Sequence, residues 1–563
     1  MTFTSLIAEQ RFVLRTLADI DRLKIEQDVI DAVLEGVAQL AAGEWAPLRR
    51  VGDTIGAKWS EAGVCLPEGF AAAYRAYVEG GWGGIAAPQG FGGQNLPFAL
   101  QMAVLETLGV ANFAFALLPI LTTGSIEALI HHGSEEQKRL YLPRLTSGEW
   151  AGTMNLTEPQ AGSDIGALRT RATPRQDGRW NITGQKIFIS FGDHDLTENI
   201  IHLVLARTPD APEGTRGISL FLVPKYRLDE SGAPSIFNDV RAVSIEHKMG
   251  LHASPTCMLS FGDNCECVGE LIGAIGGGMP AMFTVMNNAR LNIGLQGVQI
   301  AEAATDKASA FAAERIQSAR AGSANRAPVP IAEHPDVRRM LLRMKAQTQA
   351  ARALVYYAAS MVDRSAGGDQ DAQMRLELLT PLAKAHATDI GCEVASLCMQ
   401  VHGGVGYVEE TGVAQFLRDV RIARIYEGTN GIQAADLVGR KLGLDNGGVL
   451  LSLINDMRRD AEGAPLCDLI AVCDEIGRGM AGLGHDDRLA ASYPYLTMLS
   501  TAVCGWLMER EARAAADDAF GRTKKVVCRF YLEQVLPEAM GLRAAATASA
   551  DLLYALDADA LRA

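Results

Sequence analysis

The sequence has few cysteines for its length, and none of them forms a group suited to a metal. Ten cysteines are spread over 563 residues, and the close pair Cys265 and Cys267 has no companion cysteine or histidine at zinc spacing. The chain also starts without a basic and then apolar leader segment, which favours reduced thiols in the cytoplasm. We therefore expect no disulfides, no metal and a cytoplasmic location.

Basic charge and long apolar runs are also in short supply. The chain carries 52 basic against 66 acidic side chains, a formal net charge of -14. Such an excess of negative charge is repelled by nucleic-acid backbones and by anionic lipid surfaces. Polar or charged residues interrupt the apolar segments, so that no uninterrupted apolar run reaches about 18 residues, the length that favours a membrane span. We expect no nucleic-acid partner and no membrane insertion.

What the chain does have is a change of pattern along its length. With 48% hydrophobic residues, it can bury several cores. Helical patterns with Gly and Pro breaks fill residues 1–150, and short strand-like runs between turns fill 151–272. Helical periodicity returns over 273–443 and continues, rich in Ala and Leu, over 444–563. We expect an α+β multidomain fold: a helical N-terminal domain, a barrel-like β-sheet domain, a four-helix bundle and an additional helical domain.

A polar loop with several glycines, residues 154–166, lies at the entry to the β region. The hydroxyls of Thr157 and Ser163, together with backbone N–H groups, are suited to the edge of a ring cofactor and to a phosphate or pantetheine arm. The same residue types are common in turns and at helix N-termini. Composition alone leaves both interpretations open.

A second segment, residues 421–433, carries a carboxylate in an unusual setting. Glu427 follows an apolar and an aromatic residue that would shield it from water, and it precedes Gly428, which lets the backbone approach a ligand closely. Burial raises the pKa of a carboxyl group towards neutrality, which suits a general base. The segment alone equally supports a glutamate that pairs with Arg421 or Arg424.

Together the two segments resemble the signatures of the acyl-CoA dehydrogenase family. Residues 156–164, Leu-Thr-Glu-Pro-Gln-Ala-Gly-Ser-Asp, are similar to the first signature, and residues 424–429, Arg-Ile-Tyr-Glu-Gly-Thr, to the second. Weaker similarities fall between them in the family's order, at residues 184–190, 248–250, 289–290, 314–315 and 400–406. The resemblance covers about residues 40–440. The long tail looks most like the large bacterial branch that includes 3-methylmercaptopropionyl-CoA dehydrogenases.

This resemblance implies a fold, a cofactor and a reaction. FAD would lie between the β domain and the helical bundle, and Glu427 would remove the α-proton of an acyl-CoA thioester while a hydride leaves Cβ for flavin N5. The product would be a trans-2-enoyl-CoA, and an electron-transferring flavoprotein would accept the electrons. Because the α-C–H is weakly acidic, relatives polarise the thioester carbonyl with a flavin hydroxyl and the backbone N–H of the catalytic glutamate.

The resemblance also assigns contacts to the flavin ring. It implies that Leu156 and Thr157 lie beside the ring, with Phe188 and Ser190 on the strand beyond. Many relatives carry Trp where Phe188 stands and Thr where Ser190 stands. An aromatic face and a hydroxyl are both kept, so we expect these two changes to be tolerated.

The remaining contacts implied by the resemblance fall on the rest of FAD and on the acyl-CoA. For FAD they are Arg315, Gln400, Gly403, Gly404 and Thr429. Arg315 would reach the FAD of a neighbouring subunit, although the residues after it depart from the usual pattern. For the acyl-CoA they are Ser163 at the CoA arm and Arg290, which we place at the start of a helix, where it could equally be solvated.

The sequence leaves two other functions open and also bears on the quaternary structure. An acyl-CoA oxidase on the same scaffold differs only in the access of O2 to the reduced flavin, which the sequence does not reveal. A DNA-associated flavoprotein of the alkylation-response type also has a helical extension, but residues 441–563 carry 13 basic and 18 acidic side chains, which disfavours DNA. We expect a homodimer, because the additional domain can occupy the surface where a second dimer would dock. A short or 3-methylthiopropionyl acyl chain is favoured by resemblance alone.

Overall fold

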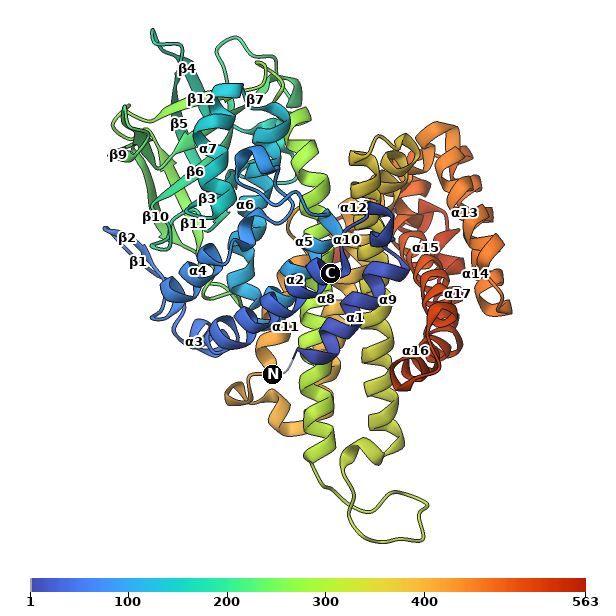
Figure 1. Cartoon of the computed structure of the whole chain (residues 1–563). Helices are drawn as coiled ribbons and strands as arrows, with labels where there is room; N and C mark the ends of the chain where they lie inside the picture. The colour runs from blue at the N-terminus through green and yellow to red at the C-terminus, as the bar shows by residue number, and fades with distance from the viewer. Residues whose placement is uncertain (1–2, 563) are drawn as a thin grey trace. The chain divides into compact units, whose positions relative to one another are not determined.

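The computed structural model describes residues 3–562, apart from the side chains of residues 4, 5 and 283–287. It divides into two compact units. The first consists of Met1–Ile7 and Ile25–Ala289, and the second of Ala8–Lys24 and Arg290–Ala563. In Figure 1 the first unit runs mainly from blue to green and the second from yellow-green to red.

The first unit begins with helices that pack on a sheet. Their bounds are α2 Gln27–Leu40, α3 Leu48–Ile55, α4 Phe70–Glu79, α5 Phe98–Ala111, α6 Phe113–His132 and α7 Glu135–Ser147. Every residue of α5 is buried, so this helix lies within the core of the unit. Among the described helices, α6 is long and apolar enough to cross a membrane, but 72% of its apolar window is buried within the protein. It has the burial of a core helix.

The sheet of the first unit has eight strands, and most of its neighbours are antiparallel. Its order is β10-β11-β5-β12-β7-β6-β3, and β4 pairs with β5 and β6. The bounds are β3 Trp150–Asn155, β4 Arg171–Pro174, β5 Trp180–Ser190, β6 Asn199–Arg207, β7 Ile218–Pro224, β10 Val240–Ile245, β11 Thr256–Phe261 and β12 Val268–Ile272. Two small hairpins accompany it, β1 Lys58–Ser60 with β2 Gly63–Cys65, and β8 Tyr226–Leu228 with β9 Pro234–Phe237. The predicted β region is confirmed.

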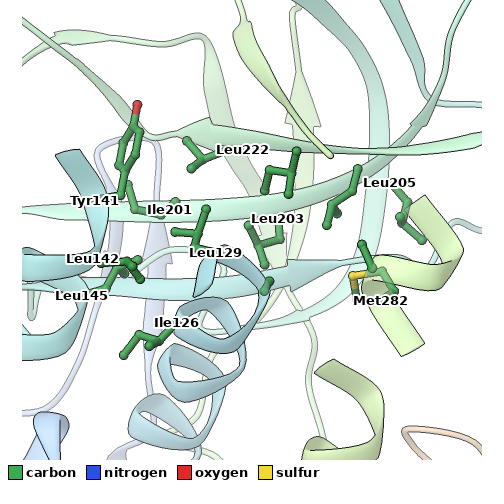
Figure 2. Packing of buried hydrophobic residues seen from close by; sticks show 14 of the residues in the cluster. Ile126, Leu129, Tyr141, Leu142, Leu145, Ile201, Leu203, Leu205, Leu222 and Met282 are labelled. Atoms are coloured by element: carbon green, nitrogen blue, oxygen red, sulfur yellow. The ribbon is translucent and has the colours of Figure 1, made fainter. Parts of the chain in front are cut away.

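Strand alternation divides the interior of this unit into two apolar cores. Successive residues of a strand point to opposite faces, so Leu203 and Leu205 of β6 join the core beneath the helices, whereas Val204 joins the other core. Figure 2 shows the first of these cores, where Leu129 of α6 and Leu142 of α7 face the side chains of β6 and β7. Both faces of β6 are therefore buried, which makes this strand and its neighbours a rigid support for the loop that follows β3.

The secondary-structure elements of the second unit are helices. After α8, Gly278–Glu314, which starts in the first unit, come α9 Pro335–Ala366, α10 Gln370–His402, α11 Ala414–Val420 and α12 Asn430–Gly439. The added C-terminal helices are α13 Gly448–Asp460, α14 Ala464–Gly479, α15 His485–Ala514, α16 Ala519–Phe530, α17 Leu536–Met540 and α18 Arg543–Ala546. The long helix α15 packs against α9, α10 and α12 of the bundle as well as against α14 and α16. The added helices thus share a core with the bundle.

One prediction about this unit is wrong. Arg290 does not start a helix, because α8 begins twelve residues earlier at Gly278. The Gly-rich stretch that ends the β region supplies the helix start instead, and Arg290 lies inside the helix with only 6% of its surface exposed. The alternative of a solvated arginine is therefore excluded.

Candidate functional site

A buried ion pair fixes the loop that follows β3. The ammonium of Lys186, on β5, lies 2.8 Å from Oε1 of Glu158 and donates to the carbonyl of Leu156 at 3.1 Å. Glu158 also accepts from the backbone N–H of Arg169 and Thr170, at 2.6 and 3.0 Å. Burial opposes ionisation, but Lys186 and these hydrogen bonds lower the pKa of Glu158 to about 2. A fully bonded carboxylate of this kind holds a loop in place and does not accept protons.

The held loop lies beside an exposed aromatic ring. The backbone N–H of Ile187 donates to the carbonyl of Thr157 at 3.0 Å, so Leu156 and Thr157 run alongside β5. The next residue, Phe188, is 59% exposed and has a φ of 60°. A bulky residue in the left-handed region is uncommon and marks strain that the surrounding structure maintains. Ser190 ends the strand, partly buried.

These features of the first unit fit the flat ring of FAD. An exposed aromatic side chain next to a fixed loop with hydroxyl and backbone donors provides a face for stacking and an edge for hydrogen bonds. The structure holds Leu156 and Thr157 against β5, the strand that also carries Phe188 and Ser190. Ser163 lies farther along the same loop and is exposed, as a contact to a flexible CoA arm requires.

In the second unit, Glu427 lies in a turn of unusual backbone conformation. Its φ is 53° and that of Gly428 is 83°, so two successive residues are left-handed between a short 3-10 turn, Arg421–Arg424, and the start of α12. Glycine adopts this conformation freely, whereas glutamate is strained in it. Backbone strain of this kind clusters at functional sites. The sequence indicated only the glycine.

Glu427 is half-buried, and opposing influences act on the pKa of its carboxyl group. Burial raises its pKa, while the positive charges of Arg290 and Lys384 act in the opposite direction. Among the residues that the structure describes, none donates a hydrogen bond to this carboxylate. A half-buried acid without bonded partners contributes little to structure and is a suitable proton acceptor.

The predicted source of the shielding was partly wrong. Ile425 is 47% exposed, so it does not cover the carboxylate. Tyr426 is held by a hydrogen bond from its hydroxyl to Oε1 of Gln296 on α8. The alternative of a salt bridge to a neighbouring arginine also fails, because Arg424 pairs with Asp389 at 2.5 Å.

Buried polar side chains hold the turn from behind. The ammonium of Lys384, on α10, donates to the carbonyl of Gly428 at 2.8 Å and to Oδ1 of Asn430 at 2.9 Å. The amide of Gln433 donates to the carbonyls of Glu427 and Gly428, each at 3.4 Å. Burial lowers the pKa of Lys384 to about 7, against the attraction of nearby carboxylates. The strained turn is thus bonded at both of its carbonyls.

Sequence reasoning missed these holding residues. Nothing in the pattern of α10 distinguishes Lys384 from a solvated lysine. Asn430 follows the second signature directly, at the start of α12, where a polar residue is common and does not by itself indicate a holding role. Its amide donates to the carbonyl of Ala385 and to Oδ1 of Asp389, at 3.1 and 3.0 Å.

Arg290 is placed to act on the same carboxylate electrostatically. Its guanidinium lies 3.9 Å from Oδ2 of Asp436 on α12. Burial lowers its pKa, while Asp436 and Glu427 counteract that effect. The structure therefore brings Arg290, Lys384 and Glu427 into one electrostatic group.

The candidates for the far end of FAD lie around the end of α10. Gly403 has a φ of 62° and ends the helix, and Gln400 and Gly404 are exposed near it. A Cβ added to either glycine would meet no atom within 4 Å, so the backbone is open to a ligand. The ring nitrogen Nε2 of His402 is buried and has no partner among the described residues. Open backbone beside such a nitrogen fits the adenosine and phosphates of FAD.

The other two cofactor candidates are placed differently. Arg315 directly follows α8 and is exposed, with one long contact of 3.4 Å to the amide oxygen of Gln317, so its guanidinium can bind phosphate. Thr429 is the N-cap of α12, and its hydroxyl accepts from the backbone N–H of Ile432 at 3.1 Å. The hydroxyl hydrogen of Thr429 remains a donor for a ligand.

Known families match nearly the whole chain. Family models match the acyl-CoA dehydrogenase N-terminal domain at residues 31–149, the middle domain at 153–264 and the C-terminal domain at 276–442. A further model, described as acetyl-CoA dehydrogenase C-terminal like, matches residues 460–557. The added helices are thus themselves a recurring domain.

Individual relatives agree with the family models. The chain is 43% identical over 558 residues to 3-methylmercaptopropionyl-CoA dehydrogenase of Ruegeria pomeroyi, and the match covers 94% of each chain. An acyl-CoA dehydrogenase of Bacillus anthracis, solved in complex with FAD, has the same fold with a TM-score of 0.74 at 21% identity, over 96% of this chain and 90% of that one.

A third match comes from a structure described as an electron transferring flavoprotein of Acidaminococcus fermentans. It has a TM-score of 0.61 at 26% identity and covers 73% of this chain and 97% of that one. The fold, the two signatures and the relatives lead to the same conclusion. This chain belongs to the acyl-CoA dehydrogenase family and is a flavin-dependent oxidoreductase whose cofactor is FAD.

Proposed function

We propose that the enzyme introduces a trans double bond between Cα and Cβ of a short acyl-CoA, with Glu427 as the base. The observation that carries this proposal is the state of the Glu427 carboxylate. Glu427 is half-buried, burial raises the pKa of its carboxyl group, and it occupies a strained left-handed turn. A structural carboxylate would not need this combination of strain and missing hydrogen bonds.

In this mechanism the protein contributes positioning, water exclusion and proton transfer. Glu427 takes the α-proton, and its backbone N–H polarises the thioester carbonyl so that the α-carbon becomes acidic enough. The positive charges of Arg290 and Lys384 act against the rise in the pKa of Glu427 that burial causes. FAD, when bound, accepts the hydride that leaves Cβ. The product is a trans-2-enoyl-CoA.

Each remaining candidate residue has one binding role in this proposal. The flavin ring is held by Leu156, Thr157, Phe188 and Ser190. The rest of FAD is held by Arg315, Gln400, Gly403, Gly404 and Thr429. The acyl-CoA is held by Ser163 and Arg290. The fixed loop of the first unit supports these roles, because a pre-organised site binds without first paying the entropy of ordering.

For the acyl group, we propose 3-methylmercaptopropionyl-CoA first and a short straight chain second. The support is the 43% identity to the Ruegeria pomeroyi enzyme of that name over nearly the full length. A panel of CoA esters scored by anaerobic bleaching of the flavin distinguishes the two. Faster bleaching with an aromatic or long-chain ester than with either would refute this choice.

We also propose a cytoplasmic homodimer that passes its electrons to an electron-transferring flavoprotein. The match to the Acidaminococcus fermentans structure supports the acceptor. An acyl-CoA oxidase is the alternative. Rapid release of peroxide under air, without an electron-transferring flavoprotein, would favour the oxidase, and turnover that depends on that acceptor supports the dehydrogenase.

Glu427→Gln tests the base directly. The amide is nearly isosteric but cannot accept a proton, so we expect anaerobic bleaching to slow by about 10³- to 10⁴-fold, while FAD absorbance and CoA-ester binding stay normal. Glu377→Gln is the matched control, because Glu377 lies on α10 and pairs with Lys441 at 2.9 Å. Near-normal bleaching by Glu427→Gln would remove Glu427 from the reaction.

A further inference from the structure

The added helical domain reaches the segment that carries the base through Tyr493. This residue lies on α15, and its hydroxyl donates to Oδ2 of Asp389 on α10 at 2.6 Å. The same hydroxyl accepts from Nη2 of Arg424 at 3.4 Å. Arg424 opens the second signature, three residues before Glu427. The contact therefore joins the C-terminal domain to the catalytic segment.

Asp389 connects Tyr493 to residues on both sides of Glu427. Its Oδ1 lies 2.5 Å from Nε of Arg424 and accepts from the amide of Asn430 at 3.0 Å. One carboxylate thus bonds a residue on each side of Glu427. Asn430 in turn is bonded to Lys384, whose ammonium holds the carbonyl of Gly428.

We propose that Tyr493 is a positioning residue for Glu427, acting through Asp389. A glutamate in a left-handed conformation persists only where its surroundings over-determine it. Tyr493 occupies one acceptor atom of Asp389, which leaves the other for Arg424 and Asn430. The added domain thereby helps to set the geometry of the base, a role beyond that of enlarging the core. This inference rests on the proposed role of Glu427 as the base.

Charge makes this contact stronger than an ordinary tyrosine hydrogen bond. A hydroxyl that donates to an ionised carboxylate forms a short bond, about twice as strong as a neutral one. The partly buried setting reduces competition from water. Loss of the bond leaves Asp389 free to turn towards Arg424, and Asn430 then loses a fixed acceptor. The displacement reaches the Gly428 carbonyl through Asn430 and then Lys384, whose ammonium donates to both.

Tyr493→Phe removes the hydroxyl and keeps the ring. Tyr495→Phe is the matched control, because Tyr495 lies two residues away on α15, is buried, and donates to the carbonyl of Cys473 at 3.1 Å. Both FAD-loaded variants are mixed anaerobically with butyryl-CoA and with 3-methylmercaptopropionyl-CoA. We expect Tyr493→Phe to slow bleaching by roughly tenfold with unchanged affinity for the ester, and Tyr495→Phe to bleach at the wild-type rate.

Two further measurements separate positioning from general loosening. Reduction by dithionite does not use Glu427, so its rate should be the same in wild type and Tyr493→Phe. Hydrogen–deuterium exchange should show faster exchange of the backbone amides of residues 425–433 in Tyr493→Phe than in Tyr495→Phe, with or without FAD. Equal exchange in this segment together with equal bleaching would overturn the proposal.

Asp389→Asn provides an independent variant of the same pathway. It should slow bleaching by a similar factor, and the double variant Tyr493→Phe/Asp389→Asn should be no slower than the slower single variant, because both changes break one chain of contacts. If Tyr493→Phe does not fold, Asp389→Asn alone decides, and wild-type bleaching by it would refute the pathway.

Failure of the proposed function has a different signature. If the base is wrong, Glu427→Gln bleaches normally, or the wild type does not bleach with any CoA ester. The amide exchange of residues 425–433 would still report whether Tyr493 orders that segment. If Glu427→Gln is inactive while Tyr493→Phe matches Tyr495→Phe in bleaching and exchange, only the inference about Tyr493 fails.

Discussion

One unit of this enzyme contains a buried glutamate, Glu158, and the other a half-buried one, Glu427, and their pKa values are shifted in opposite directions. Glu158 in the first unit accepts hydrogen bonds from Lys186 and from the backbone of residues 169 and 170, and its pKa is lowered to about 2. Glu427 in the second unit faces two cations, yet its pKa is raised by burial. Burial alone therefore does not decide what a carboxylate does.

The two carboxylates differ in whether their oxygens are still free to accept a proton. Every proton-accepting position that Glu158 offers is directed at a fixed donor, so it stabilises its loop at all ordinary pH values. The hydrogen bonds around Glu427 instead end on the backbone carbonyls of Glu427 and Gly428. The protein holds the turn and leaves the carboxylate unbonded. This is the arrangement expected of a base that must accept and then release a proton.

Exchanging each carboxylate for an amide should produce the largest contrast. At pH 7, Glu158→Gln breaks a buried ion pair and leaves Lys186 uncompensated, so we expect the free energy of unfolding to fall by about 3–5 kcal/mol. Glu427→Gln should leave the free energy of unfolding unchanged or raise it by up to about 1 kcal/mol, because a partly buried charge is removed from the catalytic site. Urea unfolding of both variants measures this.

The contribution of Glu158 to the free energy of unfolding should also fall as the pH is lowered. Because its folded pKa is lowered from 4.5 to about 2, its stabilisation is present above pH 4.5 and is lost as the pH falls towards 2. The difference in stability between wild type and Glu158→Gln should therefore shrink at pH 3. A difference that is the same at pH 3 and pH 7 would show that packing, and not charge, carries the effect.

The pH dependence of activity tests the opposite treatment of Glu427. The positive charge of Lys384 lowers the pKa of Glu427, so Lys384→Met should raise that pKa further. The rate of bleaching rises with pH as Glu427 loses its proton, and this ascending limb should move to higher pH in Lys384→Met. The measurement is the anaerobic bleaching rate from pH 5 to 9.

Lys441→Met is the control for this shift. Lys441 is also a buried lysine of the second unit, but it pairs with Glu377 at 2.9 Å. Its loss should leave the ascending limb in place. An equal movement of the limb in both variants would assign the shift to general loosening of the bundle, and no movement in Lys384→Met would contradict the electrostatic role.

The sequence predicted the parts of this enzyme that depend on local pattern. The helices α5 and α6 and the strands β5, β6 and β7 lie where the apolar runs, their lengths and the turn residues between them indicated helices and strands, because these are local features of the chain. The partial shielding of Glu427 from water was also predicted, although Ile425 was wrongly credited with part of it. The family and its cofactor came from the resemblance of two short signatures.

What the sequence could not predict depends on contacts between distant residues. Lys384 lies 43 positions before Glu427, and Tyr493 lies 66 positions after it, in a different domain. Nothing local distinguishes these side chains from solvated ones. The mistaken helix start at Arg290 has a related cause, because a glycine-rich run can end one element and begin the next. Positions of this kind are set by tertiary packing, which a pattern of apolar residues does not specify.

The smallest predicted effect concerns two threonine hydroxyls with contrasting uses. The hydroxyl of Thr170 donates to Glu158 at 2.6 Å, whereas that of Thr429 accepts from the N-terminal turn of α12. Thr429→Ala removes an N-cap, so we expect it to lower the free energy of unfolding by about 1 kcal/mol. Thr429→Ser, which keeps the hydroxyl, should restore most of it. If Thr429 also donates to FAD, the alanine variant alone will bind FAD more weakly in a titration of the apoprotein. Equal FAD affinity in wild type, Thr429→Ala and Thr429→Ser would limit the role of Thr429 to capping α12. Thr429 would then support the strained turn only indirectly, by stabilising the first turn of the helix that follows it.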